Sequence, residues 1–315
     1  MIKVLSWNNR GLGYPSKITA LRDLIQTERP EIVLIQETKQ DQIETNKIIN
    51  QQKHFHGCAS EARGASGGIL TMWDNNAWIC ESTRVHQHWI QVKLESRTGG
   101  TNVTIYNVYV PNQYREKEVC WNTLETSIEE EHNNNLIIAG NLNLVLHSNE
   151  KRGGHYTPDP FRNRLEIVMQ EHDLVDIRPK NRRYTWSNRR IGVGNIMERL
   201  DRFMISTAYL STFSTGHSSI LSLSASDHYP ITLTLQRHCQ LGPILFRYNV
   251  IWNWIPAAKE VVWQAWMQHV EGSPTYIWET KIKRVRQALK NWAKSNYTEP
   301  EIRKKQIKEE LDEAQ

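Results

Sequence analysis

Cysteine and long apolar runs are both scarce in this sequence. Its 315 residues include four cysteines, Cys58, Cys80, Cys120 and Cys239, which lie far apart and form no Cys-x-x-Cys pair. This spacing argues against a zinc site or a disulfide scaffold and predicts a reducing, intracellular compartment. No apolar run approaches the roughly 18–20 residues of a membrane span, and Met1 leads directly into the strand-like IKVLSW. We therefore expect neither a membrane anchor nor a signal peptide.

Internal repeats and low-complexity segments are also absent, and the net charge of +5 only weakly favours a polyanionic partner. One stretch is more informative, because residues 178–202 contain eight Lys or Arg against two acids, interrupted by Tyr184 and Trp186. Cations interleaved with aromatic rings are typical of surfaces that follow a phosphate backbone. A solvated loop is an equally good interpretation of the charges, and for Trp186 we favour a place in the core.

Apolar runs alternate with amphipathic segments up to about Gln236, in a chain that is 39% hydrophobic and can bury a substantial core. Eight segments predict β-strands: 3–7, 32–36, 68–73, 90–94, 103–110, 136–139, 199–205 and 231–235. Three segments predict helices: 16–28, where Ser16 follows Pro15 and could cap, 115–131 and 160–172. Many strands with few helices predict an α+β sandwich, two sheets packed face to face with helices outside.

The sequence changes character after Cys239. Residues 240–247 predict a linker, and the Trp-rich remainder predicts helices that end in a charged helix at 301–315. Apolar residues at spacings of 3, 4 and 3 form one amphipathic seam: Ile282, Val285, Leu289 and Trp292. We favour a helical appendage that packs on the rest of the chain, and the alternative is a seam that binds a partner protein.

Short polar motifs lie at or within the predicted strands. They are Trp7-Asn8-Asn9-Arg10, Gln36-Glu37-Thr38, Tyr109-Val110-Pro111-Asn112, Gly140-Asn141-Leu142-Asn143, Arg199-Leu200-Asp201-Arg202-Phe203 and Ser226-Asp227-His228. Each alone has an ordinary explanation, such as a turn cap or a surface acid. As an ordered set they resemble the active-site series of the endonuclease/exonuclease/phosphatase superfamily, the fold of apurinic endonucleases and pancreatic-type deoxyribonuclease.

A closer resemblance is to the endonuclease domain that opens the second reading frame of plant non-LTR (LINE-type) retrotransposons. It rests on seven ordered motifs: SWNNRGLG at 6–13, IQET at 35–38, SGG and a run ending in Trp at 66–73, SNEKRGG at 148–154, YTWSN at 184–188, RLDRF at 199–203 and SDH at 226–228. The IQET motif lacks the spacer residue of the family's I-x-QET. Residues 242–247 resemble the connector that leads to reverse transcriptase in those elements, and no reverse transcriptase domain is present in this sequence.

The resemblance implies a four-layer α/β sandwich over residues 1–237 and a helical connector or extension over 238–315. It also implies a divalent cation, Mg²⁺ with Mn²⁺ as the alternative, held by Glu37 with help from Asn8 and with Asp227 beside it. By the same resemblance His228, oriented by Asp201, contacts the scissile phosphate of DNA. Tyr109 and Asn143 hydrogen-bond the phosphate and the leaving oxygen. The candidate substrate-binding residues are Asn112, Arg182, Arg183, Trp186 and Asn188.

Asn141 departs from the family pattern Gly-Asp-Phe-Asn, in which the Asp aligns and activates the attacking water. An amide has nearly the shape of a carboxylate but carries donor hydrogens and takes no proton near neutral pH. Loss of a general base typically costs about 10²–10⁴-fold in rate. We therefore expect a retrotransposon-derived, Mg²⁺-dependent DNA endonuclease that is weakened or inactive. Decay of an element copy, co-option by a host and deliberate substitution all explain Asn141.

Two other functions remain open from the sequence. The first is a non-catalytic nucleic-acid-binding or regulatory protein that keeps the fold and has given up cutting. The second is the same fold acting on a phospholipid or an inositol phosphate, against which the basic stretch 178–202 argues. A DNA substrate would imply the nucleus, with the cytoplasm as the alternative location.

Overall fold

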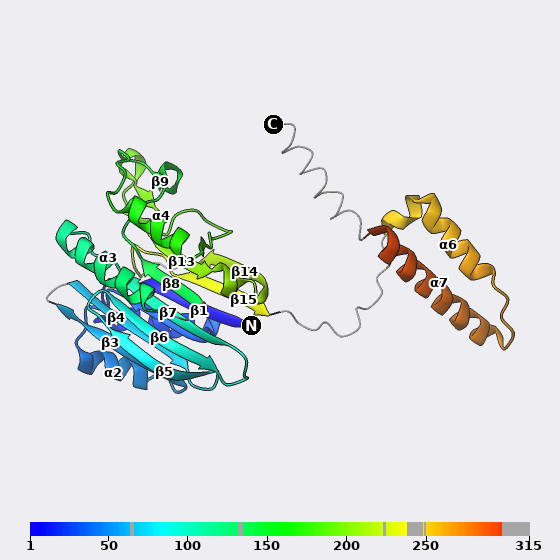
Figure 1. Cartoon of the computed structure of the whole chain (residues 1–315), viewed down its shortest axis with the longest axis horizontal. Helices are drawn as coiled ribbons and strands as arrows, with labels where there is room; N and C mark the ends of the chain where they lie inside the picture. Colours follow the sequence, from blue (N-terminus) through cyan, green and yellow to red (C-terminus); the bar gives the residue numbers. More distant parts are fainter. Residues whose placement is uncertain (64–65, 132–134, 223–224, 238–247, 249, 298–315) are drawn as a thin grey trace. The chain divides into compact units, whose positions relative to one another are not determined.

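The structure is a computed structural model that describes residues 1–63, 66–131, 135–222, 225–237, 248 and 250–297. The chain divides into two compact units, Met1–Cys239 and Gln240–Gln315. Among the described residues, the first unit contains all the β-strands and the second contains only helices (Figure 1).

One large sheet of the first unit has six strands in the order β14-β15-β1-β2-β4-β3. β1 pairs in parallel with β2 and antiparallel with β15, so the sheet is mixed. Its strands are β1 (Ile2–Asn8), β2 (Ile32–Gln36), β3 (Phe55–Arg63), β4 (Ser66–Asp74), β14 (Phe213–Ile220) and β15 (Ile231–Arg237).

The other large sheet has the order β10-β13-β8-β7-β6-β5, with β7 and β8 parallel and the other neighbours antiparallel. Its strands are β5 (Trp78–Val85), β6 (Trp89–Ser96), β7 (Asn102–Tyr109), β8 (Leu136–Asn141), β10 (Leu174–Asp176) and β13 (Asp201–Ser206). A small third sheet contains β9 (Lys151–Arg152), β11 (Trp186–Ser187) and β12 (Met197–Glu198).

Helices lie on the outer faces of both large sheets (Figure 1). They are α1 (Pro15–Glu28), α2 (Gln42–Asn50), α3 (Tyr114–Glu129) and α4 (Arg162–Glu171). The short α5 (Thr207–Leu210) instead contacts β13 and β14, and its Tyr209 is buried in the layer between the sheets. Pro15 opens α1, where its fixed φ suits the first turn and no N–H is needed. The predicted cap by Ser16 is wrong, because Tyr14 occupies the cap position and makes no side-chain capping bond. α2 begins with a true cap, since the Asp41 side chain accepts from Glu44 N at 2.8 Å.

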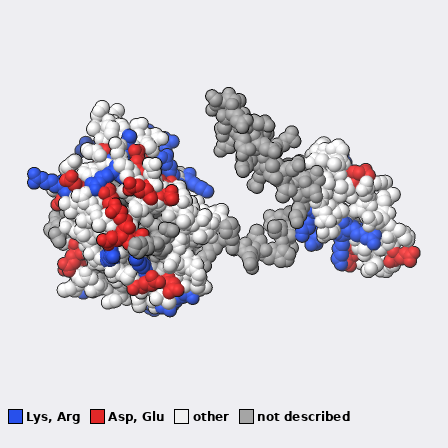
Figure 2. Space-filling model, viewed as in Figure 1, with Lys and Arg blue, Asp and Glu red and all other residues white. Residues whose placement is uncertain are grey.

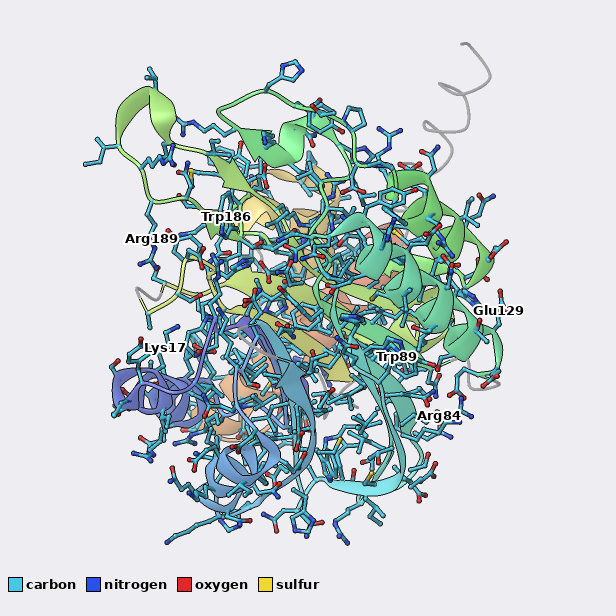
Figure 3. The ribbon with its side chains drawn as sticks, turned by 90° about the vertical axis from the view of Figure 1, so that its left-hand side faces the viewer. Lys17, Arg84, Trp89, Glu129, Trp186 and Arg189 are labelled. Carbon is cyan, nitrogen blue, oxygen red and sulfur yellow. The ribbon has the colours of Figure 1, made fainter. Side chains whose placement is uncertain are left out.

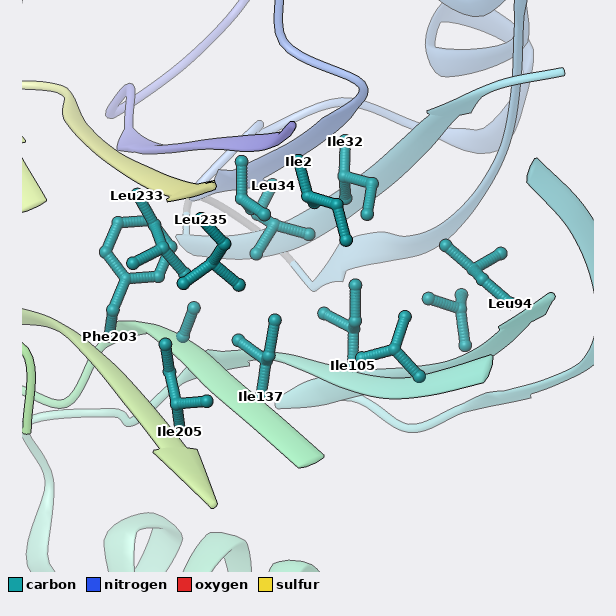
Figure 4. Packing of buried hydrophobic residues seen from close by; sticks show 14 of the residues in the cluster. Ile2, Ile32, Leu34, Leu94, Ile105, Ile137, Phe203, Ile205, Leu233 and Leu235 are labelled. Carbon is teal, nitrogen blue, oxygen red and sulfur yellow. The ribbon is translucent and has the colours of Figure 1, made fainter. Parts of the chain in front are cut away.

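The first unit has four layers, namely helices, a sheet, a second sheet and further helices. Three apolar clusters pack these layers together. The layer between the sheets is drawn from strands of both, as Ile32, Leu34, Ile105 and Phe203 illustrate in Figure 4. One outer layer packs α1 and α2 against the first sheet, and the other packs α3 and α4 against the second. Two packed mixed sheets flanked by helices confirm the predicted α+β sandwich.

Every predicted strand and helix of the first unit is present, with ends that differ by a few residues. The segment 199–205 loses its first two residues, since β13 begins at Asp201. Arg199 and Leu200 instead bond through their backbones to Glu150 and Leu142. The prediction missed α2, the edge strands β3, β5 and β14, and the short strands. Edge strands leave one flank and much of a face in water, so their sequences lack a continuous apolar pattern.

One polar contact crosses the apolar layer between the sheets. Gln36, the last residue of β2, donates from Nε2 to Asn107 Oδ1 on β7 at 2.6 Å. Asn107 in turn donates to Leu70 O on β4 at 3.0 Å. All three residues are completely buried. Because a buried amide must find its partners, this contact fixes the alignment of the two sheets directly beside Glu37.

The helical unit contains a short 3-10 turn (Val250–Trp254), α6 (Pro256–Met267) and α7 (Pro274–Tyr297). Trp252, Ala258 and Leu289 are buried together, and Val285 and Trp292 pack against them. Most of the predicted seam is therefore covered within its own unit, while Ile282 is 49% exposed. The predicted linker 240–247 and the predicted helix 301–315 lie outside the described residues. None of the helices described here is long and apolar enough to cross a bilayer.

Candidate active site

The candidate site lies where strands of the two sheets end together. β7 and β8 run parallel, so Tyr109 and Asn141 end their strands side by side, and antiparallel β13 brings Asp201 opposite Asn141. A cavity of about 830 Å³ opens at this edge. The cavity wall includes six of the predicted site residues: Glu37, Tyr109, Asn112, Asn143, Trp186 and His228.

His228 and Asp201 form a buried pair. The Nδ1 atom of His228 lies 2.9 Å from Asp201 Oδ2, and the two residues are 3% and 2% exposed. Burial alone would lower the pKa of His228, but the charge and hydrogen bond of Asp201 outweigh it and raise the pKa above its usual value. Since Nδ1 is used by Asp201, Nε2 is the ring nitrogen left for a ligand in the cavity.

The YTWSN motif supports this pair from the neighbouring segment. Thr185 Oγ1 accepts the backbone N–H groups of Leu200 and Asp201, each at 3.0 Å. Trp186 donates from Nε1 to Asp227 Oδ2 at 2.9 Å, and its ring centre lies 6.5 Å from that of His228. The expectation that Trp186 belongs to the core is wrong, because the half-buried ring lines the cavity.

Glu37 and Asp227 face a common cation, the guanidinium of Arg10. Arg10 bonds Asp227 Oδ2 through one amino group, and its Nε lies 3.8 Å from Glu37 Oε2. Lys39 Nζ is also 3.8 Å from Glu37 Oε2. On the buried side, Asn8 Nδ2 donates to Glu37 Oε1 at 2.9 Å. Burial works against the charged form of Asp227, yet Trp186, His228 and Arg10 hold its pKa below the usual value.

Two carboxylates that converge on one cation offer the hard oxygen ligands that Mg²⁺ prefers. Mg²⁺ commonly uses one or two protein carboxylates and takes its remaining ligands from water and substrate phosphate. The residues present therefore fit a divalent cation. Asn8 turns its nitrogen toward Glu37, so its side chain orients that carboxylate. Within the described parts of the chain, no cluster of three or more His, Cys, Asp or Glu is arranged around a metal position.

The backbone around these groups adopts left-handed conformations that cost energy for residues with a Cβ. The φ angles of Arg10, Glu37, Lys39 and Asn143 are 52°, 51°, 52° and 46°. Gly68 of the SGG motif allows the Glu37 loop to approach, since a Cβ at Gly68 would meet Thr38 Oγ1 at 2.3 Å. Such concentrated backbone strain is typical of sites where function fixes side-chain positions.

Asn141 is fully buried at the end of β8, and its two side-chain atoms differ in their surroundings. Its Oδ1 accepts the backbone N–H of Asn143 at 2.9 Å, which identifies that atom as the oxygen. Its Nδ2 has no hydrogen-bond partner among the described residues. The preceding Gly140 has φ of +133°, and a Cβ there would lie 2.0 Å from Val108 O. The Gly of this motif is therefore required by packing, whereas the Asn141 amide leaves a donor unsatisfied.

Asn143 and Tyr109 complete the cavity wall, where the Tyr109 side chain is hydrogen-bonded to Glu37. The Asn143 side chain donates to Val110 O at 2.6 Å, and Lys117 Nζ holds the Asn143 carbonyl at 2.9 Å. Lys117 is itself buried and paired with Asp159. Burial and the negative charge of Glu37 raise the pKa of Tyr109 well above its usual value. The Tyr109 hydroxyl therefore stays protonated and can donate a hydrogen bond.

Three predicted substrate-binding residues do not line this cavity. Arg182 and Arg183 line a second cavity, described below. Asn188 supports its own loop, because its Oδ1 accepts Ile196 N at 3.0 Å and its Nδ2 donates to Gly194 O at 2.9 Å. Asn112 does line the active-site cavity and is exposed.

A buried ion-pair network explains two of the sequence motifs and was not predicted. Glu150, from SNEKRGG, contacts both arginines of RLDRF, with Arg199 at 2.9 Å. Asp176 also contacts both, with Arg202 at 2.9 Å. Burial would raise the pKa of Glu150, but its bonds to Arg202 and Arg199 lower it to about 2. The network ties β13 to the segment after β8 and so supports Asp201.

Sequence reasoning also missed Arg10, Lys39 and Lys117 as parts of the site. Arg10 and Lys39 belong to or adjoin recognised motifs, and their positions next to Asn8 and Glu37 were the available signal. Lys117 lies on α3, far in sequence from its contacts, and nothing in its local sequence indicates burial.

Comparison with known proteins agrees with this architecture. Residues 5–228 match the Endonuclease/Exonuclease/phosphatase family, and the chain belongs to that family. Among solved structures, an AP endonuclease from Archaeoglobus fulgidus has a TM-score of 0.61 at 17% identity, with 75% of this chain and 99% of that chain covered. An Asp-to-Asn variant of a Neisseria 3′ phosphatase bound to a product DNA hairpin has 0.59 at 17%, covering 75% and 100%. The endonuclease domain of the telomere-specific non-LTR retrotransposon TRAS1 has 0.56 at 16%, covering 76% and 100%. At these identities the three structures establish the shared fold.

Proposed function

We propose that residues 1–237 form a DNA phosphodiesterase domain of retrotransposon origin, of the plant LINE type, whose hydrolytic step is weakened at Asn141. The observation that carries the proposal is one cavity lined by Glu37 and His228. Asp201 bonds His228 and pairs across the strands with Asn141, and Asp227 bonds Arg10 and Trp186 of the same cavity. Family membership supports phosphodiester chemistry, and the DNA-bound Neisseria relative and the TRAS1 domain support DNA as the substrate. The seven motifs described above support the plant element.

Glu37 and Asp227 would hold a divalent cation, with Mg²⁺ as the first candidate and Mn²⁺ as the second. When bound, such a cation supplies neutralisation of charge on the scissile phosphate and on the leaving 3′-oxygen. Asn8 keeps Glu37 oriented through its 2.9 Å bond, and Trp186 does the same for Asp227. Arg10 bridges Glu37 and Asp227 in the free protein. When a metal ion binds these carboxylates, Arg10 must therefore either move away or contact them together with the metal ion.

His228 would stabilise the phosphate as its charge develops. Asp201 raises the pKa of His228 and occupies Nδ1, so the protonated ring presents Nε2–H to a phosphate oxygen. Tyr109 donates a second hydrogen bond, because its raised pKa keeps the phenol protonated. Asn143 is fixed beside them by Val110 and Lys117 and completes the set of groups around the phosphate.

Asn141 would weaken the step that activates water. Its oxygen is taken by the Asn143 N–H, so the side chain offers only the unsatisfied N–H₂ group to its surroundings. A donor cannot accept the proton of an attacking water, and loss of a general base costs about 10²–10⁴-fold. The same observation favours the alternative function, a nucleic-acid-binding protein that keeps the fold but does not cut. In this alternative a partner protein would bind the C-terminal seam, where the half-exposed Ile282 could contact it.

Nicking of supercoiled plasmid in Mg²⁺ or Mn²⁺ tests the proposal. We expect Asn141→Asp to nick about 10²–10⁴-fold faster than the unchanged protein. The double variant Asn141→Asp with His228→Ala should lose that gain. Nicking by the unchanged protein that His228→Ala alone abolishes would contradict the role given to Asn141. If no variant nicks while DNA binding persists, the binding function replaces the enzymatic one. Turnover of an inositol phosphate or phospholipid would instead identify a different substrate.

A further inference from the structure

A second cavity, of about 420 Å³, lies beside the first and carries a rim of cations. The rim cations are Arg178, Lys180, Arg182 and Arg183, and all four are exposed. On the face of the first unit that Figure 2 shows, acidic and basic side chains are interspersed. The rim is therefore a local concentration of positive charge.

The floor of this cavity does not neutralise the rim. Glu150 and Arg199 line the floor, and both are 2% exposed. Together with Asp176 and Arg202 they form the network described above, in which two negative and two positive charges balance each other. Arg178 approaches Glu150 to 3.8 Å but its side chain remains 53% exposed. The positive charge of the rim is thus left for a ligand.

The segment that carries the rim is held rigidly. Lys180 N donates to Ser218 O on β14 at 3.1 Å. The Asn181 side chain donates to Ile220 O at 2.7 Å and accepts Ile220 N at 2.9 Å. Arg182 places its guanidinium 5.7 Å from the ring centre of Tyr229. Because the backbone of the segment is fixed, binding of an anion need not order the segment, and only the side chains of the rim cations lose freedom.

The two cavities are lined by residues that are close in sequence. Trp186 lines the active-site cavity three residues after Arg183, a separation of at most about 11 Å along the chain. Likewise Leu200 lines the active-site cavity, and Arg199 beside it lines the second. DNA carries a phosphate about every 3.4 Å of axis on each strand, so about three phosphates per strand span this distance.

We propose that the second cavity binds backbone phosphates of the nucleic acid whose scissile phosphate occupies the first. Arginine favours phosphate through its paired, fixed N–H donors, and several cations in one rim favour a polyanion over a single carboxylate. The inference rests on the proposed function in taking nucleic acid as the partner. It adds a contact site that is separate from the reacting groups and independent of cutting.

The test is the salt dependence of DNA binding by the full chain in EDTA, where no cutting occurs. The variant Lys180→Ala with Arg183→Ala removes two rim cations and leaves Arg182 on Tyr229. Arg22→Ala with Lys53→Ala is the matched control, because these exposed cations lie outside both cavities. Fluorescence anisotropy of a labelled duplex is measured from about 50 to 200 mM salt. Loss of two phosphate contacts should reduce the slope of log K against log salt by about 1.8, and the control should keep the slope of the unchanged protein.

If the rim variant keeps the salt slope of the unchanged protein, or if the control variant changes by the same amount, the inference is overturned. The proposal that the protein binds DNA is not affected by that outcome. A chain that shows no salt-dependent DNA binding would overturn both the inference and the DNA substrate. A reduced slope together with absent nicking by Asn141→Asp would support the second cavity and count against the enzymatic function. Lys180→Gln with Arg183→Gln repeats the loss of charge with longer side chains if the alanine variant does not fold.

Discussion

Two sets of buried charges meet at β13, and they differ in how their charges are paired. Arg199 and Arg202 each contact both Glu150 and Asp176, so every charge of this cluster is paired within it, although the Nε atom of each arginine has no hydrogen-bond partner among the described residues. Asp201 lies between these arginines in sequence and is equally buried. One of its oxygens bonds His228, while its Oδ1 has no hydrogen-bond partner among the described residues.

This difference distinguishes side chains that stabilise the fold from side chains that can take part in the reaction. A closed network of ion pairs gains nothing from a ligand, and its removal leaves unpaired buried charge. A buried group that is incompletely bonded and adjoins a residue of the cavity wall, such as Asp201 Oδ1 beside His228 or Asn141 Nδ2 beside Asn143, has hydrogen-bonding capacity left. One five-residue motif therefore contains both structural and chemical residues. The predictions below test this separation.

The largest effect on stability is expected from opening the closed cluster. Arg202→Ala leaves Glu150 and Asp176 with one arginine between them, in a place where Arg202 is 1% exposed. Breaking a buried ion pair by removing one partner costs about 3–5 kcal/mol. Urea unfolding followed by circular dichroism should show this loss in the free energy of unfolding.

The control for Arg202 is Arg84→Ala, which breaks an ion pair with Glu130 that is about half exposed on both sides. Figure 3 shows Arg84 on the opposite side of the molecule from Trp186 and Arg189. We expect no measurable change in its unfolding midpoint. If the two variants lose similar stability, the network is not the closed structural cluster described here.

A smaller effect on stability but a large one on chemistry is expected from Asp201→Asn. The change keeps the shape and removes the charge that raises the pKa of His228, so burial should bring this pKa below its value in the unchanged protein. In the Asn141→Asp background, nicking should fall by about 10²–10³-fold, the usual cost of losing one charge-stabilising donor. The imidazole pKa is measured by NMR titration and does not depend on nicking.

The same pair has a pH signature with a definite sign. Because folding raises the pKa of His228, its contribution to stability is fully present below the unfolded pKa of about 6.5 and is lost as pH rises through the folded pKa. The unchanged protein should therefore exceed Asp201→Asn in stability most clearly near pH 6, with a narrowing difference above it. A difference that grows with pH would contradict the assigned charge on His228.

Most of the fold could be predicted because long periodic segments report burial directly. Residues 103–110 alternate and are rich in β-branched and aromatic side chains, and β7 forms there. β14 could not be predicted, since its polar sequence FSTGHSSI becomes a strand only through its pairing with β15. Sheet pairing of an edge strand is a tertiary effect that the local sequence does not record.

The sequence predicted many of the residues that form the candidate site, but it did not predict most of the contacts that they make. Glu37, Asp201 and His228 follow from family motifs, and the structure brings Glu37 and His228 to one cavity with Asp201 bonded to His228. The placement of Arg182 and Arg183 in a different cavity could not be predicted, because it depends on Asn181 anchoring their segment to β14. Likewise, the bridge from Arg10 to Asp227 joins residues 217 positions apart.

The smallest effect is expected from Arg10, the single side chain that links the two carboxylates of the candidate metal site. Arg10 links Glu37 and Asp227, and its side chain is 48% exposed, so its pairing should be worth about 0.2–1 kcal/mol. Arg10→Ala should therefore raise the affinity for Mn²⁺ about 1.4- to 5-fold, the equivalent of that energy, because the cation no longer competes with a guanidinium. Electron paramagnetic resonance of free Mn²⁺ gives the affinity without DNA or turnover, and Arg22→Ala serves as the control. A fall in Mn²⁺ affinity would mean that Arg10 orders the carboxylates for the metal, and the cluster around Glu37 would then be pre-organised by its cation.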